Sequence, residues 1–138
     1  GSTFPIIKQI VTGTTTTQVD LSSATLTDTG LTATIVPTSA SSKILVLVSQ
    51  SVAHNGRSIG RLVIFKAASN IYDTIDVGDA DNQRSLHFAT VLDAPSTTSS
   101  TVYKTQMARF DQSGTINVQR NDSGSAGKST IILIEVAA

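Results

Sequence analysis

The 138-residue sequence contains no cysteine and no tryptophan, and only 14% of its residues are charged. Without cysteine no disulfide can form, so stability must come from apolar burial, from sheet hydrogen bonds or from association with other copies. The missing tryptophan removes the commonest platform for stacking on sugar rings. Ten basic residues balance ten acidic ones. This balance argues against a nucleic-acid partner, because binders of the phosphate backbone carry an excess of positive charge.

Long apolar runs are missing as well. No run approaches the roughly 20 residues of a membrane-spanning helix, and no charged stretch leads into an apolar one as in a signal peptide. We therefore expect no membrane insertion. Gly1 and Ser2 resemble a cloning remnant, and residues 3–138 are expected to form one domain, because about 150 residues fold around a single core.

Serine and threonine make up over a quarter of the chain, interleaved with runs of Val, Ile and Leu. Threonine favours strands and serine favours turns, so this composition predicts ordered β-structure. Residues 31–36 alternate apolar and threonine side chains, which is the period of a half-buried strand, and Pro37 ends it. Residues 43–48 and 61–66 contain the continuous apolar runs 44–48 and 62–65, typical of central strands covered on both faces. Asn55-Gly56 predicts a turn before the second run.

Further strands are predicted from similar patterns, and none of the segments has the 3.6-residue period of a helix. They cover residues 6–11, 18–21, 85–93, 101–110, 114–120 and 129–136. The cluster 121–124 should turn the chain into the last strand and form a C-terminal hairpin. About nine or ten short strands predict an all-β fold, an antiparallel β-sandwich of jelly-roll-like build. The predicted core includes Ile44, Val46, Val48, Leu62, Ile64, Phe88 and Val118.

No catalytic constellation stands out. Neither His54 nor His87 lies in a Gly-x-Ser-x-Gly elbow, so we expect no enzyme and assign no catalytic residue. His54, beside Asn55-Gly56, is expected in a loop, and His87 on the outer face of a strand. The acidic residues between Asp73 and Asp81 depart from the spacing of a calcium-binding EF-hand loop, which predicts a solvated loop with no metal and no cofactor.

Three stretches carry a family resemblance. They are Asp28-Thr-Gly-Leu-Thr-Ala-Thr-Ile-Val-Pro-Thr-Ser-Ala-Ser-Ser-Lys-Ile-Leu-Val, Asp93-Ala-Pro-Ser-Thr-Thr-Ser-Ser-Thr-Val-Tyr-Lys-Thr-Gln, and Ser129-Thr-Ile-Ile-Leu-Ile-Glu-Val-Ala-Ala. In this order they resemble the C-terminal domains of phage tail-fibre and related virion proteins, especially those of marine and environmental phages. The resemblance implies a trimeric β-sandwich at the virion surface, whose loops touch the host. It brings no catalytic residues with it.

The leading hypothesis is therefore a non-enzymatic virion structural protein, a terminal tail-fibre domain that attaches to the host surface or caps the fibre. Its partners would be other virion proteins and a host-surface glycan or protein. One alternative is a capsid decoration or head-fibre protein that stabilises the shell. Another is a free carbohydrate-binding module, in which Tyr72 or Tyr103 would stack on a sugar.

Residues 53–83 match the family pattern least and are rich in charged and polar turn residues. Because loops on a rigid scaffold often carry function, we expect recognition in the loops between Ala53 and Arg84. The candidate binding residues are His54, Asn55, Arg57, Arg61, Tyr72, Asp79, Asp81 and Arg84.

The final strand predicts an oligomer. Ile131, Ile132, Leu133 and Ile134 place large aliphatic groups on both of its faces, whereas a strand in a two-sheet sandwich normally buries one face. A homotrimer would bury Ile131 with Leu133, or Ile132 with Ile134, according to the register. The alternative is that this strand lies in the centre of its own sheet and is covered within one chain.

Overall fold

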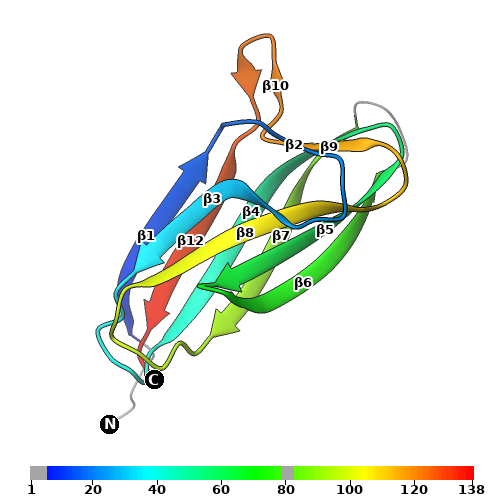
Figure 1. Cartoon of the computed structure of the whole chain (residues 1–138). Helices are drawn as coiled ribbons and strands as arrows, with labels where there is room; N and C mark the ends of the chain where they lie inside the picture. The colour runs from blue at the N-terminus through cyan, green and yellow to red at the C-terminus, as the bar shows by residue number, and fades with distance from the viewer. Residues whose placement is uncertain (1–5, 79–82) are drawn as a thin grey trace.

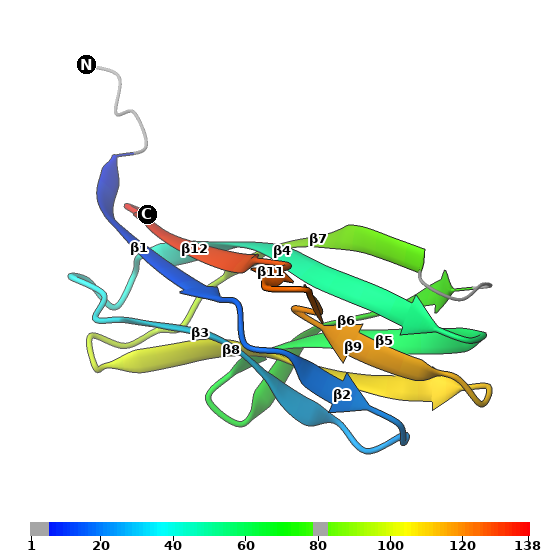
Figure 2. The same cartoon turned by 90° about the horizontal axis from the view of Figure 1, so that it is seen from above.

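The structure, a computed structural model, describes residues 6–78 and 83–138, and most of them lie in strands. Within these ranges there is no helix. The strands are β1 (Ile7–Thr15), β2 (Val19–Leu21), β3 (Thr27–Ile35), β4 (Lys43–Asn55), β5 (Ser58–Lys66), β6 (Ser69–Gly78), β7 (Gln83–Asp93), β8 (Thr101–Asp111), β9 (Thr115–Val118), β10 (Asn121–Asp122), β11 (Ser125–Ala126) and β12 (Ser129–Val136). Two antiparallel sheets pack face to face (Figures 1 and 2), which confirms the predicted all-β sandwich.

Strand β4 organises the first sheet. This sheet has the order β1-β12-β4-β9-β2, and β7 pairs with the other edge of β4. With 13 residues, β4 is long enough to pair with β12 along its first part and with β9 along its last four residues, both on the same edge. The second sheet has the order β3-β8-β5-β6.

The predicted C-terminal hairpin is wrong. Strand β9 pairs with β4 and β2, not with β12. Residues 121–124 do form a turn, with Ser123 and Gly124 at positive φ, but this turn closes the small β10–β11 ladder, which projects from the sandwich (Figure 1). The turn itself was predicted correctly. The partner of β9 was not, because β9 pairs with the part of β4 that β12 leaves unpaired.

The core lies between the sheets and is built by alternation along the strands. Leu31, Ala33 and Ile35 are all buried, as the period of two predicts. Six of the seven predicted core residues are buried; they are Ile44, Val46, Val48, Leu62, Ile64 and Val118. Phe88 is the exception, because 73% of it is exposed and its neighbour Ala89 enters the core instead. Alternation separates the two faces of β7 correctly, but it does not tell which one faces inward.

A buried polar network joins the two sheets. Gln50 of β4 lies fully inside the sandwich, where its Oε1 accepts a hydrogen bond of 2.8 Å from Thr105 Oγ1 of β8. Its Nε2 donates to Gln119 Oε1 at 2.7 Å and to Ser129 Oγ at 3.0 Å. Ser129 Oγ in turn donates to Gln119 Oε1 at 2.7 Å. Since buried polar groups are costly unless paired, these bonds fix the position of β4 relative to β8 and β12.

Gln119 extends the network to the N-terminal part of the chain. Its Nε2 donates to the carbonyl oxygens of Thr17, at 2.9 Å, and Thr29, at 2.8 Å. The residue lies just after β9 with φ at +50°, a conformation that is uncommon for residues other than glycine. The bonds to Thr17 and Thr29 show what holds this backbone in place.

A second buried group, Glu135 of β12, ties the opposite end of the sandwich together. Its carboxylate accepts hydrogen bonds from Gln9 Nε2 at 2.8 Å, Thr38 N at 2.8 Å and Thr38 Oγ1 at 2.9 Å. Burial raises the pKa of Glu135, but the hydrogen bonds from Gln9 and Thr38 outweigh it and hold the pKa at about 2. One carboxylate thus links β1, the β3–β4 connection and β12.

We predict that Ser129→Ala lowers the free energy of unfolding by about 1–3 kcal/mol. The substitution removes the hydroxyl that receives hydrogen bonds from Gln50 Nε2 and Ser51 N, and leaves these donors buried. Urea denaturation measures the change. Ser49→Ala, on the outer face of β4, is the matched control and should stay within about 0.5 kcal/mol of the parent. Equal effects of the two substitutions would show that the network contributes nothing specific.

We also predict that acid destabilises the fold through Glu135. Because its folded pKa of about 2 lies below the usual 4.5, its stabilisation is complete above pH 4.5 and is lost as the pH falls from 4.5 towards 2. Melting temperatures measured between pH 6 and pH 2.5 should fall more steeply for the parent than for Glu135→Gln, which should already be less stable at pH 6. Parallel curves for the two proteins would contradict the assignment.

Candidate binding surfaces

His54 was predicted in a loop, and this is wrong. It lies at the buried end of β4, with only 1% of it exposed. Its Nδ1 lies 2.6 Å from the Oγ of Ser58, the first residue of β5, which is fully buried as well. The sequence did not reveal this pair. A histidine that contacts a serine hydroxyl supplies two of the groups of a hydrolase site, but here the serine hydroxyl is buried and no substrate can reach it. The pair links the end of β4 in one sheet to the start of β5 in the other.

His87 was predicted on the outer face of its strand, and this is wrong. It pairs with the buried Gln50, so it shares the inward face of β7 with Ala89, near the rim of the sandwich. Its Nε2 lies 2.9 Å from Ser85 Oγ.

The two tyrosines proposed as sugar-stacking platforms are not free surfaces. Tyr103 is fully buried, and its hydroxyl donates to Asp93 Oδ2 at 2.6 Å. Burial and this hydrogen bond to a carboxylate both raise the pKa of Tyr103. Tyr72 of β6 is partly buried against the core. Neither ring is presented to solvent as a flat platform.

The other candidate residues do not converge on one site. Asn55 and Arg57 flank the β4–β5 turn, where Gly56 has φ at +78°. Arg84, at the start of β7, forms an ion pair with Asp122 at 2.5 Å, and Arg61 lies on β5 in the other sheet. Asp79 and Asp81 lie outside the described residues. The segment from Ala53 to Arg84 was expected to hold one strand, at residues 61–66, between recognition loops, but most of it lies in β5 and β6.

The outer face of the second sheet, the polar face, carries ion pairs, and Ile75 and Val102 are exposed on it as well. On it, Arg61 holds Asp73 of β6 through two hydrogen bonds, Nε to Oδ1 at 3.0 Å and Nη2 to Oδ2 at 2.6 Å. Asn70 Nδ2 donates to the same carboxylate at 3.2 Å. The hydrogen bond from Arg61 lowers the pKa of Asp73, so this carboxylate stays ionised at neutral pH.

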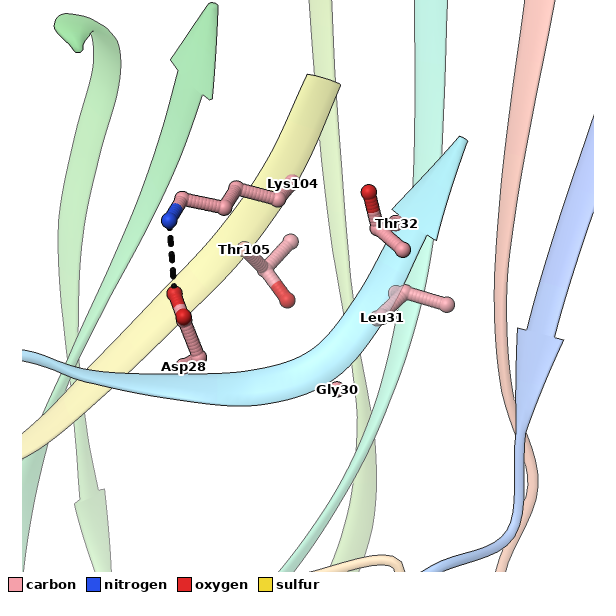
Figure 3. A pocket seen from close by; sticks show the side chains of 6 residues that line it. All are labelled: Asp28, Gly30, Leu31, Thr32, Lys104 and Thr105. Atoms are coloured by element: carbon pink, nitrogen blue, oxygen red, sulfur yellow. Dashed lines mark ion pairs between the residues drawn. The ribbon is translucent and has the colours of Figure 1, made fainter. Parts of the chain in front are cut away.

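A pocket opens on the same face where β3 bulges away from β8. Asp28 pairs with Gln106 and Thr32 with Lys104, so three residues of β3 lie opposite a single residue of β8. The middle one is Gly30, whose φ of +88° suits glycine and strains other residues. The cavity has a volume of about 230 Å³ and is shown in Figure 3. Its lining consists of Asp28, Gly30, Leu31, Thr32, Lys104 and Thr105.

The rim of this pocket carries an ion pair between Asp28 and Lys104. Asp28 Oδ1 lies 2.9 Å from Lys104 Nζ (Figure 3) and accepts a hydrogen bond of 2.8 Å from Gln106 Nε2. The bond from Gln106, and then the one from Lys104, lowers the pKa of Asp28. Leu31 also lines the pocket, but it is only 1% exposed. A charged acceptor and a charged donor therefore stand side by side at the rim.

The candidate residues predicted from sequence did not include this pocket, although a signal was present. Gly30 directly precedes the alternating residues 31–36. An isolated glycine in a strand pattern indicates a bulge or a close contact with another backbone segment. Nothing in the sequence indicated that Lys104, more than 70 positions later, would face it.

The outer face of the first sheet is apolar. Ile10, Ile134, Leu45 and Leu92 are direct cross-strand neighbours in β1, β12, β4 and β7, and they form one row across four strands. Ile10 is 60% exposed and Leu92 is 55% exposed. Ile132 and Leu47 continue the surface in the next row, and Phe88 and Leu86 extend it along β7.

This apolar face carries no charge between Lys43 at one end and Arg84 at the other. Its outward positions are Ile10, Thr12, Thr14, Leu45, Leu47, Ser49, Ser51, Leu86, Phe88, Thr90, Leu92, Thr130, Ile132 and Ile134. At the end near Arg84, Gly127 lies against Ser51. Ile131 and Leu133, by contrast, are fully buried between the sheets. Contiguous exposed apolar surface of this kind marks an interaction site.

Within residues 6–78 and 83–138, no three side chains of His, Cys, Asp or Glu are grouped to hold a metal ion. In the same ranges, no helix has the length and hydropathy needed to cross a membrane.

Comparison with known proteins yields similarity at the level of the sandwich only. No family model and no curated protein matches the chain. A solved structure of infectious bursal disease virus, Gx strain, matches with a TM-score of 0.41 and 13% identity, over 99% of this chain and 38% of that one. A carbohydrate-binding module of family 4 (CBM4) matches with a TM-score of 0.32 and 15% identity, over 93% of this chain and 92% of that one. The chain thus spans less than half of the viral chain that it matches.

Proposed function

We propose that the chain is a non-enzymatic structural domain of a phage virion, a terminal tail-fibre domain that contacts the host surface. The observation that carries this proposal is the contrast between its two broad faces. One is apolar and free of charge, whereas the other bears paired charges and a pocket. A domain with these two faces is suited to be held in an assembly by the first and to present the second.

The occupant of the apolar face is a further copy of the same chain. Strands lie about 4.8 Å apart. Rows on one face lie about 6.8 Å apart, because only every second residue of a strand faces outwards, so four strands and four rows outline roughly 500 Å². Two such faces together reach about 1,000 Å², the size at which specific interfaces begin. The absence of charge at the centre also fits, because charged residues are depleted in interface cores.

A homotrimer is the assembly that we propose, with three apolar faces turned towards one axis. This arrangement would shield Ile132 and Ile134, and leave Ile131 and Leu133 in the core of each copy. The resemblance of residues 28–46, 93–106 and 129–138 to tail-fibre domains supports it. The polar face would then point outwards, towards the host.

We predict a mass near three times 14.4 kDa for the purified protein at micromolar concentration, measured by light scattering. The double substitution Phe88→Asp and Ile134→Asp should yield monomers with an unchanged circular dichroism spectrum, because desolvating two carboxylates opposes burial of the face. Thr34→Asp, on the outer face of the other sheet, should leave the mass unchanged. A parent mass near one chain would overturn the proposed assembly, and a mass near two chains would replace the trimer by a face-to-face pair.

We further predict that gold-labelled antibody against this domain binds the virion at the ends of its tail fibres in electron micrographs. The polar face should remain accessible there, so an antibody raised against the Thr34→Asp variant should bind equally well. Label confined to the head would overturn the tail-fibre assignment and favour a decoration protein that clamps the shell.

A further inference from the structure

We infer that the pocket at the β3 bulge binds one neutral sugar unit of a surface glycan. The inference deepens the proposed function by naming the chemical class of its ligand. It does not require the trimer, because every lining residue belongs to one chain.

The shape and lining of the pocket suit a small ring that is apolar on one side. The cavity has a volume of about 230 Å³, and Gly30 and the almost fully buried Leu31 contribute to its lining. Small-molecule sites combine a mostly apolar lining with a few well-placed polar groups. A pyranose ring has this character, with C–H groups on its faces and hydroxyl groups around its edge.

The rim supplies one acceptor and one donor from neighbouring side chains, Asp28 and Lys104. Both contacts of the Asp28 carboxylate, from Lys104 and Gln106, go to Oδ1, which leaves Oδ2 to accept from a ligand. The Lys104 ammonium has three N–H donors, of which the ion pair uses one. Asp28 is 59% exposed in its side chain and Lys104 32%, so a ligand can approach both. Two neighbouring hydroxyls can therefore bind the pair together, one donating to Asp28 and the other accepting from Lys104.

The same pair selects against charged ligands. One carboxylate and one ammonium leave the rim with no net charge, and Asp28 remains ionised at neutral pH because its pKa is lowered. A uronic acid or a phosphate would bring a second negative charge against Asp28 Oδ2. A neutral sugar satisfies both groups without such repulsion.

The floor of the pocket is held rigid by the core. The Thr105 hydroxyl is bound to Gln50 Oε1 and lies 2.5 Å from Thr29 Oγ1, within the buried network. Thr32 Oγ1 donates to the carbonyl oxygen of Tyr103 at 3.1 Å. A site whose lining is fixed in advance loses less conformational entropy when it binds.

The test is a titration of isotope-labelled protein, followed by NMR, with the methyl glycosides of glucose, galactose, mannose and N-acetylglucosamine. At least one sugar should cause saturable shifts in the amides of Gly30, Leu31, Thr32 and Lys104. The titration extends to the order of 100 mM, above the millimolar Kd expected for a single sugar ring. Methyl glucuronide is the anionic comparison and should bind at least about tenfold more weakly than the best neutral glycoside.

Two variants and one control link the shifts to the pocket. Asp28→Ala should weaken binding at least about tenfold, because it removes a charged hydrogen-bond acceptor. Thr32→Trp should abolish binding by filling the cavity, and strand positions tolerate aromatic residues well. Asp73→Ala is the matched control, since it removes a paired carboxylate from the same face outside the pocket and should leave the affinity unchanged.

The outcomes separate the inference from the proposed function. No saturable shift with any sugar, or equal affinity of the parent and Asp28→Ala, would overturn the sugar site. Glucuronide binding as tight as that of the neutral glycosides would overturn the neutral class. None of these results would alter the light-scattering mass or the position of the antibody label, which test the assembly and the place on the virion.

Discussion

The buried hydrogen-bond network around Gln50 is the constraint on which the rest of the structure depends. Apolar side chains between two sheets exclude water, but they leave the sheets free to slide because hydrophobic contact has no direction. Thr105, Gln119 and Ser129 each hold Gln50 at a defined angle and distance. The network therefore determines which part of β4 faces which part of β8. The network also fixes the position of the segment that leads from β9 towards β12.

Both surfaces are consequences of this arrangement. Thr105 is bound to Gln50 and lies opposite three residues of β3, and the pocket lies at this bulge. On the other sheet, β12 and β7 pair with the two edges of β4, which brings Ile134 and Leu92 to either side of Leu45. The apolar face exists only because these strands, distant in the chain, are neighbours in one sheet.

The place of the charges follows the same division. The ion pairs Arg61–Asp73 and Lys104–Asp28 lie on the outer face of the second sheet, whereas the outer face of the first carries no charge across four strands. With 14% charged residues in the chain, such an uneven distribution concentrates polarity on one side. This difference between the two faces is the observation on which the proposed role rests.

Local pattern alone was sufficient for most of the strands, because it depends only on neighbouring residues, but it did not predict β6. The alternation at Leu31, Ala33 and Ile35 and the turn at Asn55-Gly56 both proved correct. It failed where the environment comes from distant segments. Phe88 is exposed because β7 turns its small residue Ala89 inward, and His54 is buried because β4 continues beyond the apolar run that marked it.

By itself, the sequence determined the all-β class, most of the strands and the two-sided apolar character of residues 131–134, since side chains alternate with a fixed period of two. Only the tertiary structure decided that Ile131 and Leu133 face the core while Ile132 and Ile134 face outwards. It alone brought Asp28 to Lys104 across the bulge. The reason is physical, because strand pairing joins residues that are far apart in the chain. The partner of a strand depends on unpaired strand edges and buried hydrogen bonds, and a local stretch of sequence shows neither.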